Sequence, residues 1–207
     1  MGEADALRDL LDAGMSVAKN NRKLPSLEEL LMLAASKGHT DTIRLLLERG
    51  ANVNPAHSYE VTPLIRAVQN DRVEAVRVLL NAGADVRQLP YNGEVALMHV
   101  RSAAVGRLLL EHGADANAPG SASSAYSGHN RTPLMEACYR KDEELIPLLL
   151  AWGADVHARD EHGVTALMIA AENCPDSQVR ILLDAGADLP PQAPRRSMSN
   201  IEPDRGG

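Results

Sequence analysis

Three histidines in the C-terminal half of the chain are the side chains best suited to bind a metal ion. They are His129, His157 and His162, and the last two flank the adjacent carboxylates Asp160 and Glu161. Imidazole and carboxylate are both common ligands of zinc. However, His157 and His162 are five positions apart in a predicted loop, and this spacing matches no compact ligand motif. A solvated acidic loop is therefore the preferred interpretation, and a metal-binding or enzymatic protein that uses these histidines is the alternative hypothesis.

The sulfur-containing side chains are better explained by packing than by chemistry. Cys138 and Cys174 are the only cysteines, and Cys138 lies on the apolar stripe of a predicted helix, so we expect a buried and unreactive thiol. Four methionines share one place, directly after a leucine of a predicted helix. There a flexible apolar side chain is expected to fill gaps between packed elements rather than to form a metal or redox site. These are Met32, Met98, Met135 and Met168.

Composition and motifs argue against several classes of function. The sequence contains no glycine-rich phosphate loop, no G-x-S-x-G and no H-E-x-x-H, so we predict neither an enzyme nor a cofactor. The net charge of −7 disfavours nucleic acid as a partner, because phosphate binding requires a basic face. The low cysteine content and the lack of a targeting signal predict a cytoplasmic protein. No apolar run approaches the roughly 20 residues that span a bilayer, so we expect no membrane contact.

The element that must position these side chains is clearest between Thr132 and Asp155. Thr132 is a favoured helix N-cap, and Pro133 suits a first helical turn, where the missing N–H costs nothing. Apolar residues then recur at helical spacing, and a polar break at Arg140–Asp142 separates them from a second apolar run. Gly153 follows that run as a left-handed C-cap. The stretch therefore predicts two helices joined by a turn.

This helix pair recurs along the chain. The glycine that follows the second helix returns at intervals of 36, 33, 30, 40 and 33 residues, and a period near 33 with two helices and a turn indicates a repeat architecture. These glycines are Gly14, Gly50, Gly83, Gly113, Gly153 and Gly186. The recurring motifs are Thr62-Pro63-Leu64, Thr132-Pro133-Leu134, Gly38-His39 and the series Gly50-Ala51-Asn52, Gly83-Ala84-Asp85, Gly113-Ala114-Asp115, Gly153-Ala154-Asp155 and Gly186-Ala187-Asp188.

In these motifs the sequence resembles the ankyrin repeat family, up to about residue 189. The resemblance implies an all-α solenoid of stacked helix–turn–helix repeats, with β-hairpin-like fingers that project between them. It places a half-repeat at 1–23 and repeats at about 26–57, 58–90, 91–117, 128–160 and 161–189, with an inserted long finger at 118–131. The Pro-rich composition of residues 190–207 predicts a disordered tail. Whether further sequence precedes the half-repeat stays open.

The third repeat departs from the regular spacing. From Leu97 to Gly113 is 16 residues where the other copies take 19, so we predict a shortened helix or turn around Arg101–Val105. Gly106 lies inside the second helix of this repeat, where glycine costs about 1 kcal/mol relative to alanine. The finger that follows is lengthened within Ala118–Arg131. We therefore expect the third repeat to be the weak point of the array, since solenoid stability is close to a sum over repeats and their interfaces.

The resemblance also implies a function, which is binding of another protein on the concave face. We expect the outward side of the first helices and the fingers to supply the contact residues, since Tyr and Arg are enriched where interface energy concentrates. The candidates are Arg66, His99, Glu136 and Arg140 from the helices, and Tyr59, Arg87, Tyr91, Tyr126 and Arg131 from the fingers. We expect a monomer that acts as an adaptor or a stoichiometric inhibitor, and the partner's identity stays open. The family also implies that Asn54 or Asn117 can be hydroxylated, which the sequence does not decide.

Overall fold

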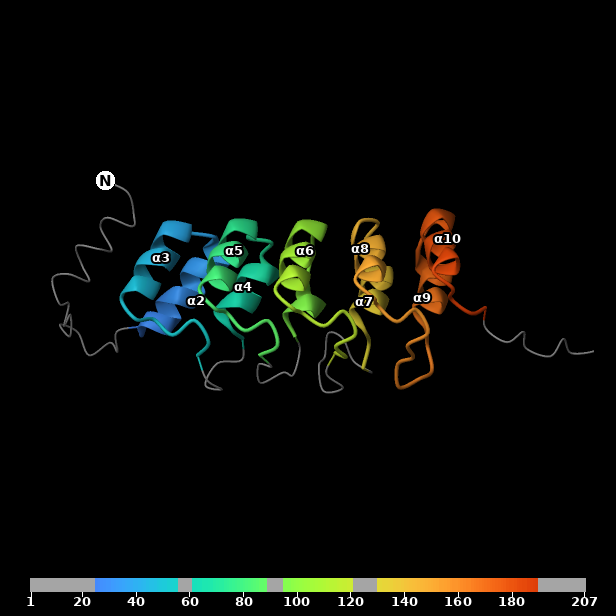
Figure 1. Ribbon diagram of the computed structural model, residues 1–207, viewed down its shortest axis with the longest axis horizontal. Coiled ribbons are helices and arrows are strands. Elements are labelled where there is room, and N and C mark those ends of the chain that lie inside the picture. Colours follow the sequence, from blue (N-terminus) through green and yellow to red (C-terminus); the bar gives the residue numbers. More distant parts are fainter. Residues whose placement is uncertain (1–24, 56–60, 89–94, 121–129, 190–207) are drawn as a thin grey trace, which may run out of the picture.

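The computed structural model of the chain describes residues 25–55, 61–88, 95–120 and 130–189. Within these ranges it is a row of helix pairs that follow one another in chain order (Figure 1). The first helices of the pairs are α2 (Leu27–Lys37), α4 (Pro63–Gln69), the 3-10 helix η1 (Ala96–His99), α7 (Pro133–Arg140) and α9 (Ala166–Asn173). The second helices are α3 (Thr40–Glu48), α5 (Val73–Asn81), α6 (Ala103–Glu111), α8 (Leu145–Ala151) and α10 (Asp176–Asp184).

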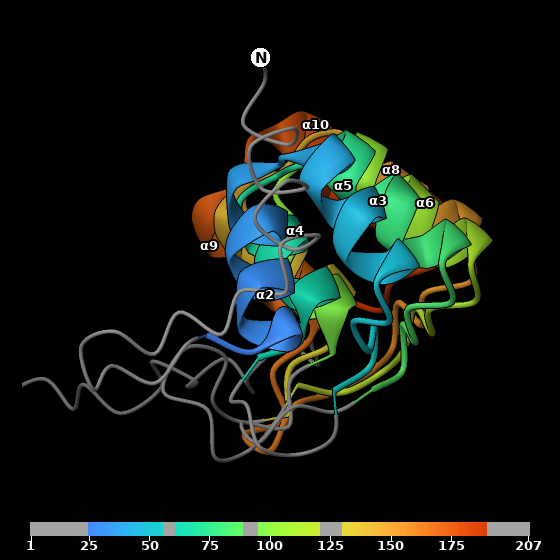
Figure 2. The same ribbon diagram turned by 90° about the vertical axis from the view of Figure 1, so that its left-hand side faces the viewer.

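The helices form two parallel columns when the row is seen along its length. Figure 2 shows α2, α4 and α9 on one side and α3, α5, α6 and α8 on the other. The connections between repeats gather at one end of both columns. In the described ranges these connections form turns and bends and contain no β-strand. The predicted all-α repeat solenoid is confirmed, with fingers that are turns wherever they are described.

Local sequence explains where the helices begin and end. The hydroxyl of Thr62 accepts a hydrogen bond from the Ile65 N–H at 3.1 Å, and Thr132 and Thr165 make the same N-cap with the residue three positions on. Ser26 forms a full capping box with Glu29. Each second helix is followed by a glycine with φ between 80° and 93°, a left-handed conformation that side chains disfavour. The repeated Thr and Gly positions therefore fix the length of each hairpin.

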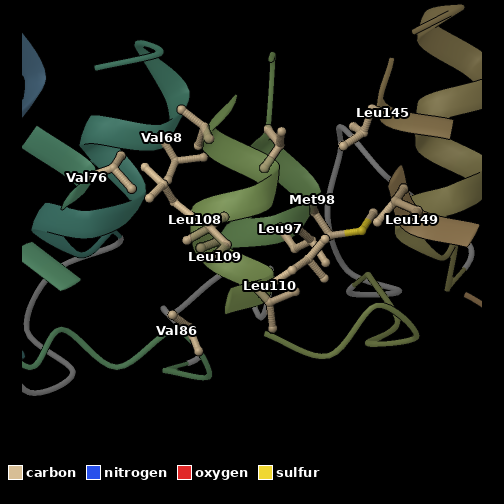
Figure 3. Close-up of a cluster of buried hydrophobic side chains, with 14 of the residues drawn as sticks. Val68, Val76, Val86, Leu97, Met98, Leu108, Leu109, Leu110, Leu145 and Leu149 are labelled. Carbon is tan, nitrogen blue, oxygen red and sulfur yellow. The ribbon is translucent and has the colours of Figure 1, made fainter. Parts of the chain in front are cut away.

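A single apolar core runs through the whole row. Leucine, valine and alanine side chains from neighbouring repeats interlock between the two columns. Figure 3 shows Val68 and Val76 of the second repeat, Leu108 and Leu109 on α6, and Leu145 on α8 within one such cluster. No repeat could bury its apolar face alone, so stability comes from stacking. None of the described helices is both long and apolar enough to cross a membrane.

The predicted shortening of the third repeat is confirmed. Its first helix is the four-residue 3-10 helix η1, whereas the other first helices have 7 to 11 residues. The end of η1 leaves the carbonyls of Met98 and Val100 without helical donors. Arg140 of the next repeat supplies the missing donors. Its Nη1 donates to the Val100 oxygen at 2.8 Å, and its Nη2 donates to the Met98 oxygen at 3.1 Å. A side chain from the neighbouring repeat thus replaces part of the missing turn.

Gly106 has a structural reason that the sequence did not reveal. A Cβ at this position would lie 2.9 Å from Cδ1 of Leu145 and 3.4 Å from Cδ2 of Leu148. Real Cβ atoms do not approach other atoms at 2.9 Å, so the absence of a side chain lets α8 pack closely on α6. Beside its cost in helix propensity, which stays a prediction, Gly106 therefore leaves room for the Leu145 side chain of the fourth repeat.

Candidate functional site

The residue two positions after the first-helix leucine occupies an equivalent place in every repeat. The five residues at this place are Leu33, Arg66, His99, Glu136 and Ile169. The exposure of these side chains decreases along the solenoid. Leu33 is 59% exposed and Arg66 is exposed. His99 is half-buried, and Glu136 and Ile169 are buried. We call the side of the first helices that carries this row, with the adjoining fingers, the groove.

Glu136 does not point outward as expected. Its side chain is buried, with 7% of the residue exposed, and its Oε1 accepts a hydrogen bond from Arg140 Nε at 2.8 Å. Arg131 Nη1 lies 4.0 Å from the other carboxylate oxygen, Oε2. The expected exposure of Glu136 is therefore wrong, because Arg140 folds across it to reach η1. Arg140 is itself partly exposed but has three of its N–H groups engaged inside the fold.

Arg131 and Tyr139 form a platform beside this carboxylate, in which Tyr139 is exposed and Arg131 is half-buried. The guanidinium carbon of Arg131 lies 5.0 Å from the centre of the Tyr139 ring, a cation–π distance. Tyr139 is 55% exposed although it belongs to a helix whose other face is buried. Sequence reasoning missed Tyr139 because it concentrated on the tyrosines of the fingers. The available signal was its place directly after the core residue Cys138, at i+3 from Glu136.

Arg87 is occupied by a contact between repeats. Asn54, Arg87 and Asn117 stand at equivalent places in successive fingers, and each donates to the carbonyl of the glycine in the next repeat. Asn54 Nδ2 donates to Gly83 O at 2.8 Å, and Arg87 Nε donates to Gly113 O at 3.2 Å. Asn117 Nδ2 donates to Gly153 O at 3.0 Å. We call this series the finger ladder, and it positions the fingers relative to one another.

The two asparagines make a second hydrogen bond that Arg87 lacks. Asn54 Oδ1 accepts from the Asp85 N–H at 2.8 Å, and Asn117 Oδ1 accepts from the Asp155 N–H at 2.7 Å. A guanidinium has no acceptor, so the junction after the second repeat has one ladder bond, where the junctions made by Asn54 and Asn117 have two. Each carboxamide thus donates one hydrogen bond and accepts another within the fold, and their hydroxylation stays untested.

The described histidines do not form a metal site. His157 occupies the next place in the finger ladder, and its Nδ1 lies 3.2 Å from Oδ2 of Asp188. The backbone N–H of His162 donates to Asp160 Oδ1 at 2.9 Å, which closes a turn. In residues 25–55, 61–88, 95–120 and 130–189, no three His, Cys, Asp or Glu side chains are grouped as metal ligands. His129 lies outside the described residues, as do the proposed contact residues Tyr59, Tyr91 and Tyr126.

Cys138 is an inert core thiol, as predicted. It is fully buried, and burial raises the pKa of its thiol to about 12. Burial also raises the pKa of Cys174, whose Sγ lies 3.1 Å from the Cys138 carbonyl oxygen. Neither thiol is held in the thiolate form that catalysis or metal binding requires.

A cleft of about 650 Å³ opens on the finger side of the third repeat. Its walls include Val86, Leu97, Leu110, Ala118 and Trp152. Trp152, at the end of α8, is 44% exposed. This cleft could not be predicted from the sequence, because its walls come from two fingers, η1, α6 and Trp152, which only the stacking of repeats brings together.

Comparison with known proteins finds matches that contain the same type of repeat. The family model of ankyrin repeats (three copies) matches residues 2–90 and 96–193. A putative ankyrin repeat-containing protein of Treponema pallidum (strain Nichols) is 31% identical over 149 residues, 70% of this chain and 48% of that protein. Human ankyrin repeat and SOCS box protein 3 is 30% identical over 173 residues, 68% of this chain and 33% of that protein.

A longer match is to a plant protein. The probable E3 ubiquitin-protein ligase XBOS33 of Oryza sativa subsp. japonica is 29% identical over 201 residues, 91% of this chain and 37% of that protein. The chain therefore spans less than half the length of these relatives. The matched family model covers most of the sequence, and the glycine and Thr-Pro-Leu positions account for the helix pairs that the structure shows. The chain belongs to the ankyrin repeat family.

Proposed function

We propose that the chain holds a protein partner in its groove, as an adaptor or a stoichiometric inhibitor, and catalyses no reaction of its own. The observation that carries this proposal is the exposure of large side chains on the first helices. Leu33 is 59% exposed and Tyr139 is 55% exposed, although each lies close in its helix to buried residues, Leu31 and Ala34 on α2 and Cys138 on α7. Exposed large apolar side chains rimmed by polar ones mark interaction surfaces.

The candidate contact residues divide into two kinds within this proposal. Arg66 and the Arg131–Tyr139 platform face the groove with few internal commitments, so they are proposed as direct contacts. Arg140, Glu136 and Arg87 are held by internal hydrogen bonds, and they would act by shaping the groove while offering only their remaining exposed atoms. His99, half-buried between Arg66 and Glu136 in the row, would contact a partner at the floor of the groove.

The names of relatives support a recognition role inside larger proteins. One relative is named an ankyrin repeat and SOCS box protein, and another a probable E3 ubiquitin-protein ligase. In each the matched repeats make up only about a third of the length. This supports an adaptor that selects a partner, whereas the inhibitor role would need no further domain.

The test is affinity capture from the cells in which the gene is expressed, with a matched pair of variants. Arg66→Glu combined with Tyr139→Ala changes the groove. The control, Arg77→Glu combined with Leu183→Ala, changes two exposed residues of the second helices α5 and α10. The groove variant is expected to lose the captured protein while the control retains it. Retention by both variants, or loss by the control alone, would place the binding surface elsewhere.

A further inference from the structure

The last described repeat leaves apolar side chains uncovered at places that are buried in other repeats. Leu183 on α10 is 38% exposed, whereas Leu80 and Leu110, at the same place in the second and third repeats, are 5% and 2% exposed. Three further residues are half-buried or exposed where their equivalents in the fourth repeat are fully buried. They are Met168, Ala171 and Val179, and the equivalents are Met135, Cys138 and Ile146.

These places lie on the side by which a repeat contacts the repeat that follows it. In the third repeat Gly106 stands at the place of Val179, and a Cβ there would meet Leu145 and Leu148 of the fourth repeat. Figure 1 shows α9 and α10 at one end of the row, and no helix pair follows them in the described residues. Terminal repeats of solenoids need a polar outer face, but this one is apolar. We call it the end face, and it consists of Met168, Ala171, Val179 and Leu183.

The two helices that carry the end face are mostly acidic. Glu172, Asp176 and Asp184 are exposed, and Arg180 is the one cation of α9 and α10. Two copies of the chain that met by their end faces would bring these carboxylates together, and like charges across an interface are unfavourable. A second copy in that arrangement is therefore a poor occupant of the end face.

Stacking of copies end to end is also disfavoured. In the fourth repeat Leu148 is the residue that contacts the preceding repeat, beside Gly106. Its equivalent in the first described repeat is Leu45 on α3, which is only 2% exposed. The end of the row that a second copy would have to offer is therefore not open at this place.

The segment that leaves the last repeat has the composition to cover the end face. Residues 190–207 follow Leu189 directly, and residues 190–200 contain Arg195 and Arg196 but no carboxylate. Their charge is therefore opposite to that of α9 and α10. They also contain apolar residues, namely Pro190, Pro191, Ala193, Pro194 and Met198.

The segment is long enough for this contact. Residues 190–200 reach about 36 Å when extended, at about 3.3 Å per residue. The nine residues of α10 span only about 13 Å, at 1.5 Å per residue. The chain leaving Leu189 can therefore cross the whole end face.

From these observations we infer that residues 190–200 lie in extended form across the end face, with Met198 on its apolar side chains and Arg195 and Arg196 on its carboxylates. The inference concerns a surface outside the groove and does not depend on the proposed function. The Pro-rich composition predicts that the segment does not fold alone, but an extended proline-rich chain needs no internal hydrogen bonds and can bind a preformed surface. Its tether gives it an effective concentration on the order of millimolar, so weak contacts suffice. The segment thereby shields an apolar patch from association with other molecules.

The experiment is intramolecular photo-crosslinking in the full chain. A benzophenone side chain replaces Met198, the protein is irradiated at low concentration, and the crosslinked peptides are identified by mass spectrometry. We expect crosslinks within one molecule to peptides of α9 and α10. Reversing the charge of the segment with Arg195→Glu and Arg196→Glu, which changes no residue of the repeats, should lower their yield at least about fivefold.

A matched pair of leucine variants tests the other side of the contact. Leu183→Asp places a charge on the end face and should lower the crosslink yield at least about fivefold. Leu33→Asp changes an exposed leucine in the groove and should leave the yield within about twofold. Circular dichroism verifies the helix content of both, and the arginine variant decides the question if Leu183→Asp loses helix.

Three results would overturn the inference. The first is crosslinking between molecules in place of crosslinking within one, which would make a second copy the occupant. The second is a spread of crosslinks over all repeats without preference for α9 and α10. The third is a yield that the arginine substitutions leave unchanged.

Discussion

Replacing Arg140 by methionine is expected to destabilise the middle of the array strongly. The substitution keeps the apolar stem and removes the guanidinium, with its bonds to Val100 O, Met98 O and Glu136 Oε1. Hydrogen bonds to a charged group contribute about 1.5–3 kcal/mol each, and breaking a buried ion pair costs about 3–5 kcal/mol. The Arg140 side chain is 37% exposed, so water can partly replace it at the carbonyls. We therefore expect a total loss of about 2–4 kcal/mol.

This loss can be measured by urea unfolding followed by circular dichroism, with hydrogen exchange to locate it. A domain of this size loses about 2–4 °C of melting temperature per kcal/mol, so a fall of roughly 4–16 °C is expected. Arg66→Met is the matched control, because Arg66 has no internal partner, and it should change stability by less than about 0.5 kcal/mol. Adding Glu136→Gln to Arg140→Met should recover part of the loss by removing the uncompensated charge. Equal stability of Arg140→Met and Arg66→Met would refute the role assigned to Arg140.

Three further changes test other parts of the structure. Gly106→Ala should lower stability by about 1–3 kcal/mol in thermal unfolding despite alanine's better helix propensity, because its Cβ meets Leu145; a more stable variant would contradict this packing. Asn117→Ala should lower the free energy of unfolding by about 1 kcal/mol, because both of its ladder bonds are lost. Arg87→Ala removes a single ladder bond and should lower it less, and the opposite order would refute the role of the ladder. The raised pKa of Cys138 stabilises the fold fully below the unfolded-state pKa near 8.5, and this contribution should disappear as pH rises towards about 12. Cys138→Ala should therefore lose less stability than the wild type over that range, and parallel pH profiles would count against the assignment.

The repeat positions were predictable because they depend on local chemistry. Thr62 and Thr132 cap helices through their own hydroxyls, and the recurring glycines adopt left-handed conformations regardless of what lies nearby. The missing turn of the third repeat was likewise visible as three absent residues. Features of this kind need only sequence spacing, so the fold followed from the pattern.

The roles of the groove residues depend on contacts between repeats, which the spacing does not encode. Helical periodicity places Glu136 outward on α7, yet the short η1 beside it lets Arg140 fold inward over the carboxylate. Arg87 belongs to a finger, but its reach to Gly113 depends on the stacking distance of two repeats. The burial of Glu136 and the contact of Arg87 with Gly113 therefore required the structure.

The expectation that the third repeat is the weak point stays a prediction, now with a sharper physical basis. The repeat has a 3-10 first helix and a single ladder bond behind it, but Arg140 and the close packing at Gly106 couple it to the fourth repeat. These contacts lie on one side of the repeat. Across the junction with the second repeat, the Ser102 hydroxyl donates a hydrogen bond to Asp71 beside the single ladder bond, so both neighbouring repeats hold the third.

The most direct test of the central claim is site-specific photo-crosslinking to a bound partner. A benzophenone side chain would be placed at Tyr139 in the groove, or at Arg107 on the opposite column of helices, in otherwise identical protein. Both positions are exposed, so the reagent itself does not favour either. The account predicts crosslinks to the partner from position 139 and none from position 107. Crosslinking from position 107 with none from position 139 would contradict binding in the groove.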